Sequence, residues 1–486
     1  MRHRRSLYST LSACRHVSVA VALLCGAATS AFAQAAAQPP AQQGPSGKPE
    51  QPLAADDVSW LFPAPTRTSD LARLIAIGDL IAPDPQDPAK RVRVWSDAAF
   101  QQFLAIAQSP AAAAGSDRIA LPAEARTIAA WHIAGVRFDP GAPGLSDAII
   151  REYGQSPQIR LVLQPVVKNA DDTVTPLDIT AHLVFNFTSG VEPPSKKGCF
   201  PRPVPDLAAF KQIVAELAVL RSRLRDGELG HNRIVTAGKA LGVHPGLVDQ
   251  TTQVNARSEM KAILERHLFP QRLAAMAIMG LPDNAPEPWI FLSMQAVPPG
   301  TVPQLPNGGF VPVHGPTLDG KQFAQLLQPA GSTPRVMPQP HTNNLAPITC
   351  VNAAVAPDAL PVKQRKGVAT SDLPANPVRT AAGKAKVLNV LNTIADPNQS
   401  HFFNTDCVSC HTETRRALEL LPPRDVPKMA AAPLPNGPWN VRNFGWSPLV
   451  EGDAAGSVSR RTAAETKAVV DFINTKLLVK AVADSR

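Results

Sequence analysis

The segment 298–377 is dense in proline, glycine and asparagine and has few apolar residues at regular spacing. The whole chain contains 50 prolines in 486 residues, about twice the usual share. Because proline fixes φ and removes a backbone donor, such a segment is a poor source of long helices or central strands. We therefore expect a connector at 298–377, with one folded part on each side of it.

The first 33 residues have the pattern of a secretory signal peptide. Four arginines precede the apolar run Val17–Ala28, and no acidic residue occurs before Gln34. Ala31-Phe32-Ala33 matches a small-x-small cleavage site, which predicts cleavage after Ala33. The apolar run is too short to remain as a membrane-spanning helix. We expect a periplasmic or secreted mature chain without a transmembrane segment.

The composition changes twice before the connector. Residues 34–56 are rich in Ala, Gln and Pro, which predicts a flexible linker. Residues 57–297 mix helical and strand-like patterns without regular βαβ alternation, which predicts an α+β domain of unknown function. Helices are expected at 71–77, 98–106, 207–226 and 257–268, and strands at 158–164, 178–187 and 289–294, the first two strands forming a hairpin or meander.

Two of these expectations rest on specific residues. Asp206 is placed to cap the helix 207–226, and Gly227 to end it. Met276 and Met279 lie in an apolar stretch and are expected to pack in the core rather than bind copper. No catalytic triad, phosphate-binding loop or dinucleotide fingerprint occurs in residues 57–297.

The last part of the chain, residues 378–486, predicts a small all-α unit. Helices are expected at 382–395 and 462–478, and Thr462-Ala463-Ala464-Glu465 reads as a capping box for the second. The formal net charge is +9, but four of the positive charges belong to the expected signal peptide. The remaining charge is spread out, so it predicts no nucleic-acid binding and at most a preference for an acidic redox partner.

Between those helices lies Cys407-Val408-Ser409-Cys410-His411. Two thiols at this spacing reach the two vinyl groups of a porphyrin, and the adjacent His then faces the iron. A thioredoxin-like redox pair would need a βαβ setting, and a zinc site would need a second ligand pair nearby. The pattern of Cys-x-x-Cys-His in an exported chain favours haem attachment over both.

In these residues the chain resembles the c-type cytochromes. The resemblance covers residues 378–486 and implies a cytochrome c-like fold with one covalent haem c. Cys407 and Cys410 would form the thioether bonds, and His411 would be the proximal iron ligand. The implied function is one-electron transfer with a periplasmic redox partner protein, as an electron carrier rather than an enzyme.

Three alternatives are open for the sixth iron position. Met429 lies in a loop-like setting but closer to His411 than is usual in the family, His401 is close before the motif, and the position can also be free of protein ligands. An open position would favour a peroxidase-like haem enzyme. A redox sensor whose N-terminal domain recognises a partner is a further alternative.

Three more residues are candidates for haem contacts. Trp439 and Trp446 could cover the haem face, and Arg442 could pair with a propionate; the alternative is that the aromatic residues form the core of the small domain. With the haem motif set aside, Cys199 and Cys350 are the remaining thiols of the mature chain, and we expect them to form a disulfide.

Overall fold

The computed structural model describes residues 52–108, 121–142, 144–193, 202–280, 290–296, 310–313, 377–400, 413, 417, 420–426, 439, 445–446 and 457–478. The expected signal peptide at 1–33 lies outside these residues, as do Cys199 and Cys350. None of the helices within the described ranges combines the length and the hydrophobicity needed to cross a bilayer.

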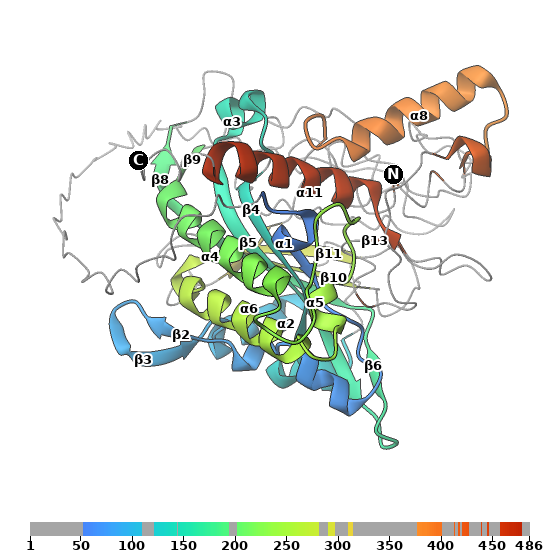
Figure 1. Cartoon of the computed structure of the whole chain (residues 1–486). Helices are drawn as coiled ribbons and strands as arrows, with labels where there is room; N and C mark the ends of the chain where they lie inside the picture. Colours follow the sequence, from blue (N-terminus) through green and yellow to red (C-terminus); the bar gives the residue numbers. More distant parts are fainter. Residues whose placement is uncertain are drawn as a thin grey trace, which may run out of the picture. The chain divides into compact units, whose positions relative to one another are not determined.

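The described fold is organised around one antiparallel sheet (Figure 1). Its strand order is β1-β4-β5-β7-β10-β11-β12, and β6 pairs with β5 outside that path. The strands are β1 Ser59–Leu61, β4 Trp131–Ala142, β5 Ser156–Lys168, β6 Val174–Pro176, β7 Thr180–Asn186, β10 Leu273–Gly280, β11 Ile290–Ala296 and β12 Phe310–Val313. Two-stranded ribbons are formed by β2 Ile81–Asp84 with β3 Asp87–Arg93 and by β8 Thr188–Glu192 with β9 Arg202–Pro205.

Strand β4 lies between β1 and β5 in the sheet, and all twelve of its residues are buried. Burial of every residue means that both faces of the sheet are covered at this strand. Pro140 is tolerated because it lies where the register with β5 shifts, between Asp139 and Ala142. Its polar–apolar alternation is interrupted at Ala134-Gly135, and Pro140 is unusual within a strand, which explains why the sequence pattern did not predict it.

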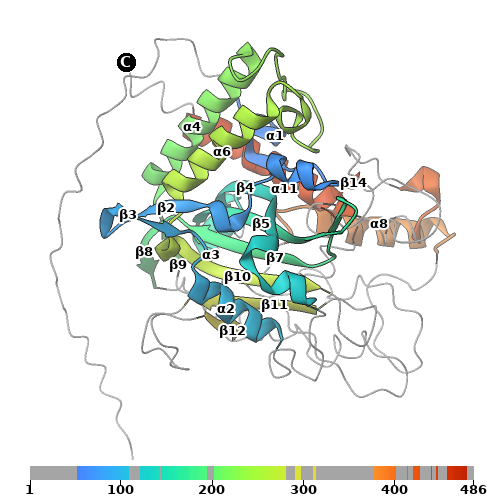
Figure 2. The same cartoon turned by 90° about the horizontal axis from the view of Figure 1, so that it is seen from below.

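Helices cover the sheet on both sides. Helices α4 Leu207–Asp226 and α6 Gln253–His267 lie side by side, and α2 Asp97–Ala107 lies on the opposite side, next to β12 (Figure 2). Trp95 lies between β3 and α2 in the chain, and its indole Nε1 donates a hydrogen bond of 3.2 Å to the sulfur of Met276 on β10. Met276 and Met279 are both buried, so the expectation that they pack in the core is confirmed. The remaining helices are α1 Ala55–Val58, α3 Asp147–Tyr153, α5 Pro245–Val248, α8 Ala381–Ala395 and α11 Arg460–Phe472, and α11 continues as a π-helical turn at Ile473–Leu478.

Most elements expected from periodicity are present with small shifts of their ends. In α4, the carboxylate of Asp206 accepts a hydrogen bond from Ala209 N at 3.0 Å. Gly227 ends this helix with a φ of +78°, which a residue with a side chain rarely adopts. The expected pairing is also confirmed, because β5 and β7 are antiparallel neighbours. The expected helices at 98–106, 257–268 and 382–395 correspond to α2, α6 and α8, and the expected strand at 289–294 corresponds to β11.

Two local expectations are wrong. The stretch 71–77 is not an α-helix: a 3₁₀ helix covers Thr68–Arg73, and the chain then extends. Asp70 causes this by accepting hydrogen bonds from the backbone N–H groups of Thr66 and Arg67, which holds a tight turn. Helix α11 begins two residues earlier than expected, because Ser459, rather than Thr462, caps it by accepting from Thr462 N at 3.2 Å.

The folded part begins and ends at other residues than the composition suggested. Leu53 is buried, and its backbone exchanges two hydrogen bonds with the Asn474 side chain, at 2.8 and 2.9 Å. The expected linker 34–56 therefore ends before Leu53. The connector 298–377 also contributes to the sheet, because β12 pairs with β11. Both differences arise because short segments gain order from long-range partners that sequence patterns do not reveal.

The described residues of the C-terminal part belong to two different apolar clusters. Val387, Leu391 and Ile394 of α8 pack with Ala417, Leu420 and Leu421 in a small cluster of their own. By contrast, Val469 and Ile473 are part of the main core, together with the sheet and α4. Helix α11 thus belongs to the main core, whereas the sequence led us to assign it to the separate unit 378–486.

This packing predicts that shortening a buried side chain of α11 or of its π-helical continuation lowers the free energy of unfolding of the first part of the chain. Ile473→Ala, at a side chain with 0% exposure, is expected to cost about 2–5 kcal/mol. The measurement is denaturant unfolding followed by the tryptophans of the sheet. Val470→Ala, at a partly buried position of the same helix, is the control and should cost clearly less. Equal midpoints for Ile473→Ala and the wild type would contradict the placement of α11 in the core.

Candidate functional site

The residues of the predicted haem site fall mostly outside the described ranges. This holds for Cys407, Cys410, His411, Met429 and Arg442, and for the alternative ligand His401. The backbone of Trp446 is described and forms the short strand β13 Gly445–Trp446, which pairs with β14 Ser457–Val458. What the structure does describe are the residues on either side of the motif.

Trp439 is buried, with 1% of its surface exposed. Its indole Nε1 donates a hydrogen bond of 2.8 Å to the backbone oxygen of Phe62, and its ring packs in the main core. A core role was the alternative for the aromatic residues of this segment, but the core involved is that of the sheet rather than of a small domain. Trp439, which follows the motif in the sequence, thereby contacts the first part of the chain.

Two consecutive arginines at the start of α11 hold the two ends of the segment 401–412, which contains the motif. The guanidinium of Arg461 donates to the backbone oxygen of Ser400, the residue before the segment. Arg460 donates to the carboxylate of Glu413, the residue after it, at 2.7 Å. Ser400 and Glu413 are both fully buried. Both ends of the motif segment are therefore fixed to the first turn of one helix.

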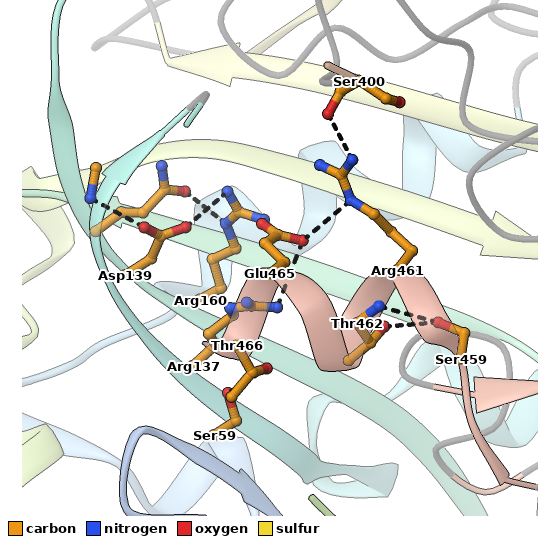
Figure 3. A network of polar contacts seen from close by, with 12 residues as sticks. Ser59, Arg137, Asp139, Arg160, Ser400, Ser459, Arg461, Thr462, Glu465 and Thr466 are labelled. Atoms are coloured by element: carbon orange, nitrogen blue, oxygen red, sulfur yellow. Dashed lines mark hydrogen bonds and ion pairs between the residues drawn. The ribbon is translucent and has the colours of Figure 1, made fainter. Parts of the chain in front are cut away.

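The same helix also takes part in a cluster of charged side chains (Figure 3). Glu465, one turn after Arg461, faces three guanidinium groups. Its carboxylate lies 3.7 Å from Arg461, 3.6 Å from Arg137 on β4 and 4.0 Å from Arg160 on β5. We call these four residues the arginine–glutamate junction. It joins α11 to the adjacent strands β4 and β5 of the sheet.

The electrostatics of the junction keep Glu465 ionised. Burial alone would raise the pKa of Glu465, but the positive charges of Arg137, Arg461 and Arg160 outweigh it and lower this pKa to about 2. An ionised Glu465 attracts guanidinium groups from three different elements at once. Its charge therefore holds the helix on the sheet at every pH above the acid range.

A second group of buried charges lies at the start of the fold, on α1. Asp57 contacts Arg221 of α4 at 3.2 Å and accepts hydrogen bonds from Thr236 and from the backbone of Ala54. Its neighbour Asp56 accepts one hydrogen bond, from the backbone N–H of Gly242 at 3.2 Å. Burial raises the pKa of Asp56 to about 7, and the charge of Asp57 adds to this. Asp56 therefore titrates near neutral pH.

The histidine closest to this group is part of the core. His244 stacks on Trp60 with ring centres 3.6 Å apart, and its Nδ1 accepts a hydrogen bond from Gly246 N. Burial lowers the pKa of His244 to about 3, so the ring is neutral. Within the described ranges, no group of three or more His, Cys, Asp or Glu side chains is arranged to hold a metal ion.

Comparisons with known proteins do not assign the chain to a family. No family model matches it, and neither the curated proteins nor the solved structures contain a match.

The arginine–glutamate junction was not expected from the sequence. Arg137 lies in β4, which the sequence did not predict as a strand, and Arg160 is one polar residue in a strand that was expected to be half-buried. The only local signal is the spacing of Arg461 and Glu465, which places both on one face of the last helix. The other two partners of Glu465, Arg137 and Arg160, lie about 300 positions away in the sequence. Only the folded chain brings them to Glu465.

Glu465→Gln tests the junction. Because the pKa of Glu465 is lower in the folded chain than its ordinary 4.5, its contribution is complete above about pH 5 and is lost as the pH falls towards 2. We expect the variant to be less stable at pH 7 by about 2–4 kcal/mol, with the difference shrinking on acidification. Urea unfolding at several pH values measures this.

The matched control for this series is Glu192→Gln. Glu192 also pairs with an arginine, Arg202, but its side chain is 55% exposed, so we expect a loss of at most about 1 kcal/mol. A Glu465→Gln variant with the same small loss, or with a loss that does not depend on pH, would contradict the account of the junction.

Asp56→Asn tests the buried acid on α1. Unlike Glu465→Gln, this substitution is expected to increase stability relative to the wild type as the pH rises. A pKa raised from 3.8 to about 7 means that wild-type stability falls as the pH rises through this window. The asparagine variant lacks this loss, so its stability relative to the wild type should increase between pH 4 and pH 8, by about 1–4 kcal/mol. Thermal unfolding across this range is the measurement, and a difference that stays constant would refute the assignment.

Proposed function

We propose that this protein is an exported c-type cytochrome that carries one covalent haem and transfers single electrons. The observation that carries the proposal is Cys407-x-x-Cys410-His411, which combines two thiols and an imidazole at the spacing of haem attachment. The signal-peptide pattern at 1–33 supports it, because haem c proteins are exported. The compartment that we propose is the periplasm or the medium.

The described surroundings of the motif fit such a cofactor. A haem held by two thioether bonds and one imidazole needs an attachment segment whose ends do not separate. Arg461 and Arg460 supply this by holding Ser400 and Glu413 on consecutive residues of α11. Glu413 is an anion with 0% exposure, so its pairing with Arg460 is costly to break. When bound, the haem would supply one-electron chemistry through Fe(III)/Fe(II).

The apolar residues around the segment also fit. Helix α8 ends at Ala395, shortly before Ser400, and packs its buried side chains against Ala417 and Leu420, which follow the segment. The apolar residues of the small cluster thus come from both sides of the motif. If these residues border the haem, they would exclude water from its edge and raise its reduction potential.

We propose Met429 as the sixth ligand, His411 being the fifth. His401 and an open position are the alternatives, and an open position would favour a peroxidase-like enzyme or a sensor over an electron carrier. The redox partner that we propose is an acidic periplasmic protein, on the basis of the net positive charge of the chain.

Haem attachment is tested by expressing the full chain in a host that attaches haem c. We expect one haem per chain in a pyridine haemochrome assay of the denatured, washed protein. Cys407→Ala with Cys410→Ala should abolish the signal, whereas Cys199→Ala with Cys350→Ala should retain it, because those thiols are not part of the motif. A wild-type chain without covalent haem would end the proposal.

The sixth ligand is tested on the same material. Met429→Ala should remove the weak long-wavelength sulfur–iron band of the oxidised protein and allow the ferrous form to bind carbon monoxide. Met337→Ala is the control, since Met337 belongs to the segment 298–377. Carbon monoxide binding by the ferrous wild type would contradict the assignment of Met429 and would favour an open iron position.

A further inference from the structure

Arg137 is a buried cation whose hydrogen-bonding capacity is not used by the described residues. It is 5% exposed. Its Nε and Nη2 are buried and have no hydrogen-bond partner there. Its Nη1 lies 3.6 Å from the carboxylate of Glu465, which is longer than a hydrogen bond. Because buried guanidinium groups nearly always find acceptors, this arrangement points to a ligand.

The neighbouring arginines of the junction are in a different situation. Arg160, directly opposite Arg137 on β5, donates to Gln158 at 2.7 Å and to Asp139 at 3.3 Å. Arg461 donates to the backbone oxygens of Ile394, Asp396 and Ser400. Both therefore have acceptors, whereas Arg137 has none among the described residues.

The charges around Arg137 are also unbalanced. Three guanidinium groups, those of Arg137, Arg160 and Arg461, face two carboxylates, those of Glu465 and Asp139, among the described residues. Two cations placed opposite each other on adjacent strands destabilise a sheet unless an anion lies near them. One further negative charge would neutralise the junction together with Asp139.

The geometry of the free atoms selects the chemistry of that anion. Nε and Nη2 lie along one edge of the guanidinium plane, so their N–H groups point in the same direction. Two parallel N–H groups match the two oxygens of a carboxylate in a bidentate pair. A carboxylate therefore satisfies both orphaned donors and supplies the missing charge.

We propose that Arg137 binds a carboxylate group through Nε and Nη2. Two sources carry this group: a propionate of the haem, in which case the inference rests on the proposed function, or a free organic acid. The first source is supported by the position of Ser400. Arg461 contacts the same Glu465 oxygen as Arg137 and also holds Ser400, directly before the motif segment 401–412.

If the haem supplies the carboxylate, Arg137 influences the iron through its charge. A cation beside a propionate destabilises the oxidised, more positive iron and so raises the reduction potential. It also keeps the propionate ionised to lower pH. The first part of the chain would then contribute directly to the redox properties of the motif in the last part.

The test is a redox titration across pH on the haem-loaded full chain. Arg137→Gln should lower the reduction potential, and the pH at which the potential begins to change should move upwards. Glu465→Gln removes a negative charge beside Arg137 and should shift the potential in the opposite direction. Arg266→Gln is the control for loss of charge alone, because Arg266 pairs with Glu216 and is 52% exposed.

The second source is tested on the full chain with Cys407→Ala and Cys410→Ala, which holds no covalent haem. If a free acid is the ligand, sodium acetate should raise the thermal unfolding midpoint of this chain above that in sodium chloride of equal ionic strength. The same acetate effect should be absent when Arg137→Gln is added. Where Arg137→Gln does not fold, Arg137→Lys replaces it, since lysine keeps the charge but loses the bidentate edge.

A potential shift in folded Arg137 variants, absent in Arg266→Gln, supports the propionate. An acetate effect that needs Arg137, without a potential shift, supports the free acid. Neither effect in folded variants overturns the proposal. The haemochrome count of the wild type shows separately whether the proposed function fails. A wild-type chain without haem would end the proposed function, but the acetate experiment on Arg137 could still be carried out.

Discussion

The carboxylate of Glu465 is the point at which three elements of the fold meet. Guanidinium groups from β4, β5 and α11 lie 3.6 to 4.0 Å from it. At these distances the attraction is Coulombic rather than a set of short hydrogen bonds, and its strength depends on the low dielectric of a covered sheet face. Without this charge, three cations would face one another between the last helix and the sheet. The position of α11 therefore depends on it.

Helix α11, which this interaction holds on the sheet, also contacts the beginning of the fold and both ends of the predicted haem segment. Asn474, just beyond the helix, holds the backbone of Leu53, and Thr466 shares a hydrogen bond with Ser59 on β1. At its other end, Arg460 and Arg461 hold Glu413 and Ser400. One helix thus connects β1, the neighbouring strands β4 and β5, and both ends of the segment that we propose to carry haem.

The sequence was sufficient for elements whose signal is local. Asp206 and Gly227 mark the ends of α4 because caps and apolar spacing are contained within one helix. It was insufficient for β4, whose alternation is interrupted at Ala134-Gly135, and for β12, which gains its order from β11. The Cys-x-x-Cys-His motif is equally local. Arg137 and Glu465 are partners only through the folded sheet, so no spacing in the sequence predicts the junction.

We infer that α11 joins the sheet and the segment that we propose to carry haem into one folding unit. Equilibrium unfolding of the haem-loaded chain in denaturant, followed by haem absorbance and by tryptophan fluorescence, tests it most directly. Trp95 and Trp131 report on the sheet, where both are buried. We expect the haem and tryptophan transitions to coincide. Two separate transitions, with the haem signal lost while the sheet stays folded, would contradict it.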